Sequence, residues 1–249
     1  MIFMNLTMLG TSHGVPSSKR YTSGYMLEVG ENIYIFDCGA PVMDMLLRRE
    51  KDLTKVKAVF NTHGHGDHIH GGISLITLFT WYFKDTKMEV CLPDKITANA
   101  ISDYLKAIDD VTVPNDRITF NIYSPGVIFD DGVVKVTAIE TRHFHDQEKK
   151  SNAFLIEAEG KTILYTGDMA CDEVTDDFPA VAYEQFIDII MTECVHFSPD
   201  KLRKVMDKVN TDIFAVIHCS EAMYDLVDAL NEEYPFEVIL GEDDDEIEL

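Results

Sequence analysis

The sequence predicts an α/β protein in which two β-sheets pack face to face and helices cover their outer faces. Short runs of β-branched, aromatic and apolar residues separated by glycine are followed by helical patterns, and this order occurs twice along the chain. A length of 249 residues with 46% hydrophobic residues is enough for a sizeable core. No stretch rich in proline, glycine or serine divides the chain, so we expect a single domain over residues 1–249.

The first half is predicted to open with strands and to continue with alternating helices and strands. Residues 41–49 are expected to form a helix, because proline is favoured in the first turn. Residues 93–108 are expected to form another, because their apolar residues recur at helical spacing. The other expected elements of this half are the strands 3–9, 25–29, 33–36, 56–62 and 88–92 and a buried helix over 69–83.

The second half is predicted to contain more strands than helices. Glu159, Gly160 and Lys161 have the composition of a hairpin turn, and Ser198 caps a helix that runs to residue 209. The other expected elements are the strands 118–123, 133–139, 153–157, 162–165, 187–191, 213–217 and 236–240 and a helix over 221–232.

The acidic C-terminal residues 242–249 allow two interpretations. Their charge is typical of a disordered tail. Residues 247–249 nevertheless alternate apolar and polar side chains, and residues 243–245 could form the turn of a hairpin that starts from strand 236–240. We therefore expect a final edge strand rather than a tail.

The run Thr-His-Gly-His-Gly-Asp-His over residues 62–68 is the most informative segment of the chain. Imidazole and carboxylate groups are good ligands for zinc and related metals, and the two intervening glycines allow tight turns. So short a segment cannot wrap one ion tetrahedrally, so its ligands suit two adjacent ions. A surface histidine cluster is the alternative, which the ordered apolar runs on both sides disfavour. The potential ligands are His63, His65, Asp67 and His68.

Further ligands are expected where predicted strands end, because loops at strand ends converge on one edge of a sheet. His143 follows strand 133–139, Asp168 follows strand 162–165 in a Thr-Gly-Asp turn, and His218 ends a very apolar strand. Taken singly, each histidine would more readily be interpreted as a core or surface residue. Together with the run 62–68 they complete the donor set of a two-metal site.

This set of ligands, in this order, resembles the metallo-β-lactamase superfamily of dinuclear hydrolases. Residues 9–17, Leu-Gly-Thr-Ser-His-Gly-Val-Pro-Ser, and residues 36–39, Phe-Asp-Cys-Gly, are similar to the phosphodiesterase branch of that superfamily. The branch includes ribonuclease Z, the tRNA 3′-processing endonuclease, and cyclic-nucleotide-type phosphodiesterases. The resemblance covers nearly the whole chain and implies a four-layer αββα sandwich with the site at the edge between the sheets.

The resemblance also implies a role for each ligand. One ion would be held by His63, His65 and His143, and the other by Asp67, His68 and His218. Asp168 would bridge the two ions. We expect zinc, with manganese or iron as alternatives. Asp37 would accept a hydrogen bond from a ligand imidazole, although an Asp that caps the helix at residue 41 is the alternative.

The expected chemistry is hydrolysis. Two ions about 3.5–4 Å apart share a water, lower its pKa from about 16 towards about 7, and neutralise the charge that develops on phosphoryl or carbonyl oxygens. A protein acid then protonates the leaving group. With Asp67 we assign Glu193 and His196 to the catalytic residues, because they are loosely similar to the Glu and the His-x-Ser/Thr motif of the ribonuclease Z branch. The match is compressed, so His145 is an alternative acid.

Charge and loop length argue against tRNA as a partner. The formal net charge is −23, from 21 basic and 44 acidic residues, and a polyanion would be repelled. The ribonuclease Z branch usually carries a tRNA-gripping arm between its third histidine and its bridging aspartate. Here the interval between His143 and Asp168 is barely long enough for a hairpin.

The expected location is the cytoplasm, in a soluble form. The first residues lack a basic region and a cleavage site, and the longest apolar stretch, residues 73–83, is too short to cross a membrane. Five scattered cysteines without a C-x-x-C pair suit a reducing compartment. Residues 81–83, Trp-Tyr-Phe, are expected to be a buried helix end, with a substrate mouth or a homodimer face as alternatives.

The sequence therefore predicts a metal-dependent phosphodiesterase that acts on a small or nucleotide-like substrate. Ribonuclease Z itself is one alternative, and a thioesterase or lactonase that shares the ligands but lacks the opening segment 9–17 is another. A metal-bound scaffold without hydrolytic activity is a third, which the complete ligand set disfavours.

Overall fold

Apolar side chains alternate along the strands and build a layer between two seven-stranded sheets. The computed structural model describes residues 3–15, 17–144, 148–170 and 177–249. In β2 (Gly24–Val29), Tyr25 and Leu27 point into the layer between the sheets, whereas Met26 points to the outer side. Phe36 and Phe60 stack in this layer with ring centroids 4.9 Å apart.

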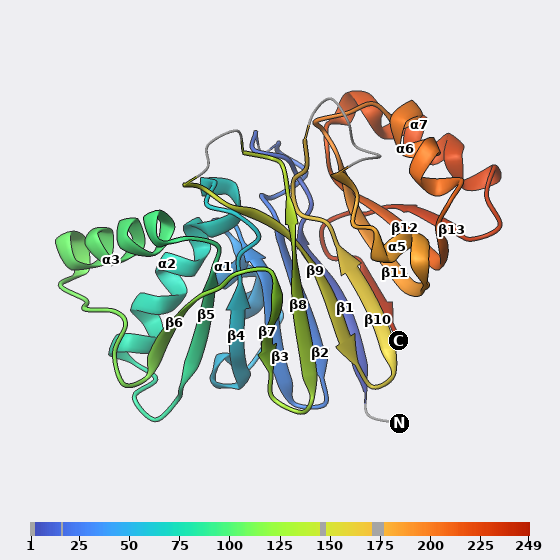
Figure 1. Ribbon diagram of the computed structural model, residues 1–249. Coiled ribbons are helices and arrows are strands. Elements are labelled where there is room, and N and C mark those ends of the chain that lie inside the picture. The colour runs from blue at the N-terminus through green and yellow to red at the C-terminus, as the bar shows by residue number, and fades with distance from the viewer. Residues whose placement is uncertain (1–2, 16, 145–147, 171–176) are drawn as a thin grey trace.

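The first sheet has the strand order β14-β1-β2-β3-β4-β5-β6, and three helices cover its outer face (Figure 1). Its other strands are β1 (Met4–Gly10), β3 (Asn32–Cys38), β4 (Val56–Phe60), β5 (Met88–Leu92), β6 (Ile118–Ile122) and β14 (Glu246–Glu248). Its helices are α1 (Val42–Arg48), α2 (Gly66–Trp81) and α3 (Lys95–Asp109), with a 3-10 turn η1 (Leu53–Lys55).

The second sheet has the order β13-β12-β11-β10-β9-β8-β7, with its own helices on its outer face (Figure 1). Its strands are β7 (Gly126–Asp130), β8 (Val134–Thr141), β9 (Ser151–Ala158), β10 (Lys161–Tyr165), β11 (Phe186–Cys194), β12 (Asn210–Cys219) and β13 (Glu237–Leu240). Its helical segments are α5 (Val181–Glu184), α6 (Pro199–Met206), η2 (Glu221–Met223), α7 (Tyr224–Asp228) and η3 (Ala229–Glu232).

These layers confirm the predicted αββα sandwich, and the local differences have physical reasons. The strand β7 was not predicted, because its side chains are mostly exposed or half-buried and give little alternation. The helix expected over residues 221–232 is interrupted and consists of the three short segments η2, α7 and η3. The helix α2 begins at Gly66 rather than at residue 69, so part of the histidine run belongs to its first turn.

The C-terminal residues form the predicted edge strand, but the predicted hairpin with strand 236–240 is wrong. The strand β14 pairs antiparallel with β1 in the other sheet. Asp243 explains the crossing, because its carboxylate accepts hydrogen bonds from the backbone N–H of Thr11 at 2.8 Å and of Tyr21 at 2.6 Å. The acidic turn is therefore held by the N-terminal part of the chain.

The aromatic end of α2 is not buried as expected. Trp81 is 50% and Tyr82 is 75% exposed, whereas Phe83 is half-buried. No helix within the described residues is both long and apolar enough to cross a membrane. The cysteines that the structure describes, Cys38, Cys91, Cys194 and Cys219, are free thiols in buried positions.

Candidate metal centre

Six strand ends bring the predicted site residues together at one edge of the two sheets. From the first sheet, Asp37 lies at the end of β3 and the run 62–68 follows β4. From the second sheet come His143 after β8, Asp168 after β10, Glu193 near the end of β11 and His218 near the end of β12. The edge between the sheets thus collects ligands from both halves of the chain.

The histidine run lies in the turn between β4 and α2 and in the first turn of that helix. The strand ends at Phe60, His65 precedes the helix with extended backbone, and Asp67 and His68 belong to the first helical turn. A carboxylate is favourable there, because it faces the positive end of the helix dipole. Gly64 is required by close packing, since a Cβ at this position would lie 2.4 Å from Thr97 Oγ1.

Three histidines form a first group of donor atoms. His63 Nε2 lies 3.0 Å from His65 Nδ1, and His143 Nε2 lies 3.2 Å from the same nitrogen. Ligand atoms of a tetrahedral zinc site with bonds of about 2.0–2.1 Å are about 3.3 Å apart. The three nitrogens are therefore spaced as ligands of one ion would be.

A second group of donor atoms lies beside the first. His68 Nε2 is 3.4 Å from Asp67 Oδ2, and His218 Nε2 is 4.0 Å from that same oxygen. Together with Asp168, the two groups contain all seven residues that the sequence predicts as ligands, and the donor atoms of each group lie within 4.8 Å of one another.

Asp168 stands between the two groups and directs one oxygen towards each. Its Oδ2 lies 3.6 Å from His63 Nε2 and 3.8 Å from His143 Nε2. Its Oδ1 lies 3.5 Å from His68 Nε2 and 3.4 Å from His218 Nε2. This is the arrangement that a bridging carboxylate requires.

Two atoms at the centre are left without hydrogen bonds. His68 Nε2 and Asp168 Oδ1 are fully buried and make no hydrogen bond to the described residues. Leaving a buried polar atom unpaired costs about 1–3 kcal/mol, and more for a charged group. Nitrogen and oxygen donors that are buried, convergent and unpaired fit a divalent metal ion, so the residues present suit the predicted cofactor.

The second ring nitrogen of four histidines is fixed by a neighbour, which aims Nε2 at the centre. His68 Nδ1 lies 2.7 Å from Asp37 Oδ2, and His218 Nδ1 lies 2.7 Å from Ser23 Oγ. His63 Nδ1 lies 3.0 Å from Thr62 Oγ1, and His143 Nδ1 lies 3.4 Å from the carbonyl oxygen of Met169. Such contacts set the tautomer and the orientation of ligand imidazoles.

Asp37 has the supporting role that the sequence suggested and does not cap a helix. Its carboxylate accepts hydrogen bonds from the backbone N–H of Thr62 at 2.8 Å and from the Tyr165 hydroxyl at 2.5 Å, besides its contact with His68. The residue at the N-cap of α1 is Pro41. Asp37 and His218 both have left-handed backbone, with φ of 52° and 44°, a conformation that costs about 1–3 kcal/mol and concentrates at functional sites.

The surroundings lower the pKa of two ligand histidines, His63 and His143, and raise the pKa of a third, His68. Burial lowers the pKa of His63 well below its ordinary value, and burial together with His196 lowers the pKa of His143 to about 4. These rings are neutral at pH 7 and keep a lone pair for a metal. Burial lowers the pKa of His68 too, but the carboxylates of Asp168 and Asp37 outweigh it, so the net shift is upward.

Glu193 and His196, the candidates for the acid, lie together at the rim of the centre. His196 Nδ1 lies 2.9 Å from Glu193 Oε2 and 4.0 Å from Asp168 Oδ2. Burial lowers the pKa of His196, but the hydrogen bond to Glu193 and the negative charges of Glu193 and Asp168 together raise it more, so the ring is held towards its protonated form. The alternative acid, His145, lies outside the described residues.

Ser23, Phe144 and Lys149 also lie at the site, although the sequence did not predict them there. The Phe144 ring lies 4.9 Å from the His65 ring, centroid to centroid, and Lys149 Nζ lies 5.7 Å from the centre of the Phe144 ring. Their closeness to His143 in the sequence was an available signal for two of them. Ser23 had none, because it is 195 positions away from the histidine it contacts.

Three solved structures share the fold of this chain. The metallo-β-lactamase fold protein YhfI from Bacillus subtilis matches with a TM-score of 0.78 at 18% identity over all of both chains. The short form of human tRNase Z matches at 0.72 with 20% identity over 98% of each chain. A diphosphatase from the PhnP family matches at 0.71 with 17% identity over 99% of this chain and 98% of that one.

Sequence relatives point to the same branch. A ribonuclease Z from Picosynechococcus sp. is 31% identical over 144 residues, which are 56% of this chain and 44% of that protein. A ribonuclease Z from Listeria monocytogenes is 32% identical over 147 residues, 56% of this chain and 46% of that protein. The chain thus spans less than half the length of the curated relatives it matches.

A family model covers most of the chain and identifies its family. The predicted resemblance to the metallo-β-lactamase superfamily and its ribonuclease Z branch is confirmed by these matches. The model described as Anti-Pycsar protein Apyc1 matches residues 4–228. The chain therefore belongs to the Anti-Pycsar protein Apyc1 family and has the metallo-β-lactamase fold.

Proposed function

We propose that the protein is a phosphodiesterase that hydrolyses a small or nucleotide-like phosphodiester. It would use two divalent metal ions, for which zinc is our first choice. The observation that carries the proposal is the position of Asp168, whose two oxygens face two separate groups of donor atoms. A single ion would leave one of these groups without a role. The site therefore suits a pair of ions and the hydrolytic chemistry that such pairs perform.

Each group of ligands would hold one ion. His63, His65 and His143 form the first set, Asp67, His68 and His218 form the second, and Asp168 is shared. When bound, the ions would supply an activated water nucleophile and neutralise charge on the phosphoryl oxygens. Asp37, Ser23 and Thr62 hold the imidazoles in the required orientation.

His196 supplies the proton that the leaving oxygen needs. Glu193 accepts a hydrogen bond from Nδ1 of this ring, which stabilises the imidazolium and orients it towards the centre. Glu193 is itself held by the backbone N–H of Met169, next to Asp168, at 2.7 Å. General acid catalysis of this kind contributes about 10²–10⁴-fold.

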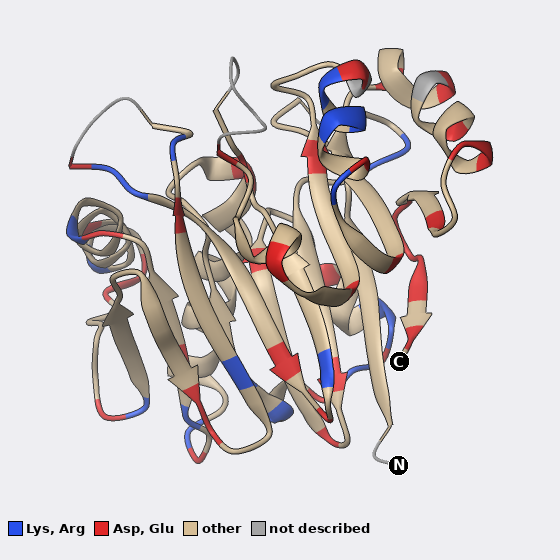
Figure 2. Cartoon of the chain, turned by 45° about the vertical axis from the view of Figure 1, so that its right-hand side comes forward, with Lys and Arg blue, Asp and Glu red and all other residues tan. Residues whose placement is uncertain are grey.

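The rim of the centre favours a small anion. Lys149 stands over the Phe144 ring beside the ligand histidines, so a cation and an aromatic surface flank the place of reaction. Over the rest of the chain, Lys and Arg are interspersed with Asp and Glu and form no continuous stripe in the view of Figure 2. A net charge of −23 with one local cationic rim supports a small phosphodiester over a tRNA.

A screen of three substrate classes tests the proposal. The protein, purified without chelators, is supplied with Zn²⁺ or Mn²⁺ and offered bis-p-nitrophenyl phosphate, a thioester and a lactone, with His65→Ala as control. We expect hydrolysis of the phosphodiester and its loss in the variant. Cleavage of the thioester or the lactone alone would contradict the proposal and favour the alternative hydrolase of the same fold.

Metal analysis and partner assays complete the test. Two equivalents of metal are expected, and less than one would favour a scaffold without hydrolytic activity. Tight binding of pre-tRNA at low salt would instead revive a ribonuclease Z activity, which the hairpin between His143 and Asp168 does not support. A cytoplasmic location and a homodimer stay predictions, which cell fractionation and light scattering would check.

A further inference from the structure

Two buried cysteines lie side by side next to the metal centre. Cys194 is the last residue of β11 and Cys219 is the last residue of β12, and the two are register partners in the parallel pairing of these strands. Their side chains belong to the same apolar layer, between the second sheet and its helices, and interact with each other. Neighbouring strands are about 4.8 Å apart, which is within the range of about 4.4–6.8 Å between the Cα atoms of a disulfide.

Two other cysteines that the structure describes belong to different layers. Cys38 packs between the first sheet and its helices, whereas Cys91 lies in the layer between the two sheets. At least one sheet therefore separates each of them from Cys194 and Cys219. Among the described cysteines, this pair is the place where two thiols meet.

A cavity gives small molecules access to one thiol of the pair. Cys219 lines a cavity of about 280 Å³ between the N-terminal loop and the segment after β12, and His13 lines both this cavity and the one at the metal centre. A water molecule occupies about 30 Å³, so an oxidant as small as hydrogen peroxide fits into this space. Cys194 is fully buried beside Cys219. A small oxidant that enters the cavity therefore reaches Cys219 first.

We infer that Cys194 and Cys219 form a redox pair, which hydrogen peroxide converts into a disulfide that weakens metal binding at the centre. The Cys219 thiol first takes one oxygen atom from the peroxide, whose O–O bond breaks, and becomes a sulfenic acid while one water leaves. The Cys194 sulfur then attacks the Cys219 sulfur. The S–S bond forms, and the displaced hydroxide leaves with the Cys194 proton as a second water. One peroxide is thus reduced to two waters, and the two thiols lose two electrons and two protons.

The disulfide would act on the metal centre through the residues that precede the two cysteines. The metal ligand His218 precedes Cys219, and Glu193 precedes Cys194. An S–S bond of about 2.0 Å is shorter than any contact between separate thiols, so oxidation draws the ends of β11 and β12 together. His218 is held by Ser23 Oγ at 2.7 Å from its Nδ1, and such contacts are worth about 10–100-fold in metal affinity. We expect oxidation to weaken zinc binding about tenfold.

A peptide map of the wild-type protein tests the bond itself. The protein is treated with hydrogen peroxide, quenched with catalase, blocked with N-ethylmaleimide in denaturant and digested without reductant. Trypsin together with Glu-C places Cys171, Cys194 and Cys219 on separate peptides. We expect the peptides of Cys194 and Cys219 to be joined. A bond to Cys171 or Cys38 instead, or a pair that stays reduced while methionines are oxidised, would overturn the inference.

Zinc affinity tests the effect on the centre. Competition with a chelating dye is measured for the reduced protein, for the oxidised protein and after treatment with a phosphine reductant, which is chosen because dithiols themselves bind zinc. We expect affinity to fall about tenfold on oxidation and to recover on reduction. Recovery excludes methionine sulfoxide as the cause, since its repair needs dedicated reductases. A disulfide that leaves zinc affinity unchanged would overturn the inference.

Two matched variants locate the response. Cys219→Ala removes the thiol that the cavity reaches, so peroxide should form no crosslink and leave zinc affinity as it was. Cys91→Ala removes a buried thiol in the layer between the sheets and should keep both the crosslink and the tenfold change. Each variant is compared with its own reduced form after thermal melting has shown that it is folded. A response that persists in Cys219→Ala would contradict the assignment.

The inference goes beyond the proposed function, because both measurements concern metal binding and use no substrate. A crosslink with weakened zinc binding would support it even if bis-p-nitrophenyl phosphate were not hydrolysed, an outcome that counts against the phosphodiesterase alone. Hydrolysis without a crosslink would overturn the redox pair alone. Absence of zinc binding by the reduced protein would overturn both.

Discussion

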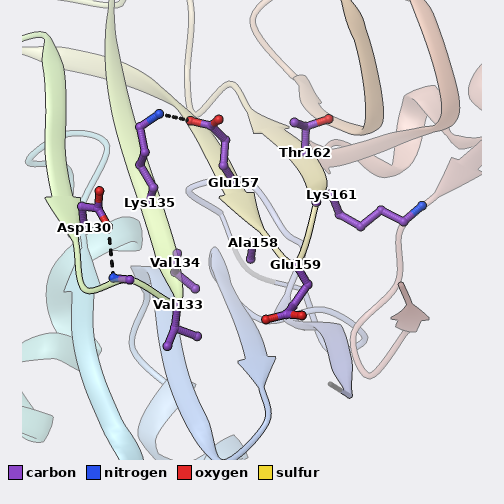
Figure 3. Close-up of a pocket in the computed structure, with 11 residues that line it drawn as sticks. Asp130, Val133, Val134, Lys135, Glu157, Ala158, Glu159, Lys161 and Thr162 are labelled. Atoms are coloured by element: carbon purple, nitrogen blue, oxygen red, sulfur yellow. Dashed lines mark hydrogen bonds and ion pairs between the residues drawn. The ribbon is translucent and has the colours of Figure 1, made fainter. Parts of the chain in front are cut away.

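The two edges of the double sheet differ in whether their polar groups are satisfied. A cavity of about 350 Å³ lies at the turns that join β7 to β8 and β9 to β10, away from the metal centre (Figure 3). There Lys135 Nζ binds Glu157 at 2.7 Å, the backbone N–H of Gly132 donates to Asp130 at 3.0 Å, and Lys161 binds Asp188 at 2.8 Å.

At the metal centre, whose cavity is only about 150 Å³, some of the buried polar atoms make no hydrogen bond. Its buried atoms His68 Nε2 and Asp168 Oδ1 make no hydrogen bond to the described residues. The two edges therefore differ in their buried polar atoms without hydrogen bonds, and the edge with such atoms is the one that suits a metal ion, although its cavity is the smaller of the two. Substitutions at the two edges should differ accordingly.

The largest effect is expected for Asp168→Asn. The change removes the charge that both groups of donors share, and we expect kcat/KM for a phosphodiester to fall by about a thousandfold, since metal-assisted charge stabilisation amounts to several kcal/mol. Metal content should drop below two equivalents by mass spectrometry. A variant that kept two equivalents and activity within tenfold of the wild type would refute the bridging role.

The next largest effect is expected for His196→Ala. Loss of the proton donor should lower kcat by about a hundredfold for an alkyl phosphodiester, whose leaving oxygen must be protonated. The loss should be much smaller for a p-nitrophenyl ester, whose leaving group departs as an anion. Equal losses for both substrates would show that His196 has a structural role instead.

Glu193→Gln should move the pH profile in a defined direction. The acid must be protonated to act, so activity is lost as pH rises through the pKa of His196. Glu193 raises that pKa, and the amide retains an acceptor for Met169 N–H. The basic limb of the kcat profile is therefore expected at lower pH in the variant. A shift to higher pH would contradict the pairing.

A moderate effect is expected for Asp37→Asn. Neighbours that orient a metal-bound histidine are worth about 10–100-fold in metal affinity, so zinc binding measured by competition with a chelating dye should weaken by this factor. Asparagine tolerates the left-handed backbone of this position and keeps one oxygen for the backbone N–H of Thr62, so the change mainly affects the carboxylate oxygen that contacts His68 and Tyr165. Unchanged zinc affinity would argue that Asp37 serves only to hold the turn at Thr62.

The smallest effect is expected at the other edge. Lys135→Ala breaks an ion pair whose side chains are 40% and 41% exposed, and such pairs contribute about 1 kcal/mol or less. The free energy of unfolding in urea should change by no more than that, with kcat/KM unchanged. A large loss of activity would mean that this cavity, too, takes part in the function.

The sequence was a good guide wherever the pattern is local. The strand β5 has the predicted bounds, since its apolar run is short and flanked by polar residues. The seven metal-ligand candidates converge as expected. The strand β7 was missed because its partner β8, and not its own composition, holds it in the sheet. The crossing of β14 was missed because it depends on Asp243 meeting Thr11, far away along the chain.

The sequence by itself determined the number and the chemistry of the donor groups, because imidazoles and carboxylates placed after strands can be read directly from the chain. Only the tertiary structure decided which atoms face each other. The two oxygens of Asp168, the contact of Ser23 with His218 and the cavity beside His13 all depend on how two sheets are stacked and in which register their strands end. Distances between groups of distant segments are properties of that packing, and no local pattern encodes them.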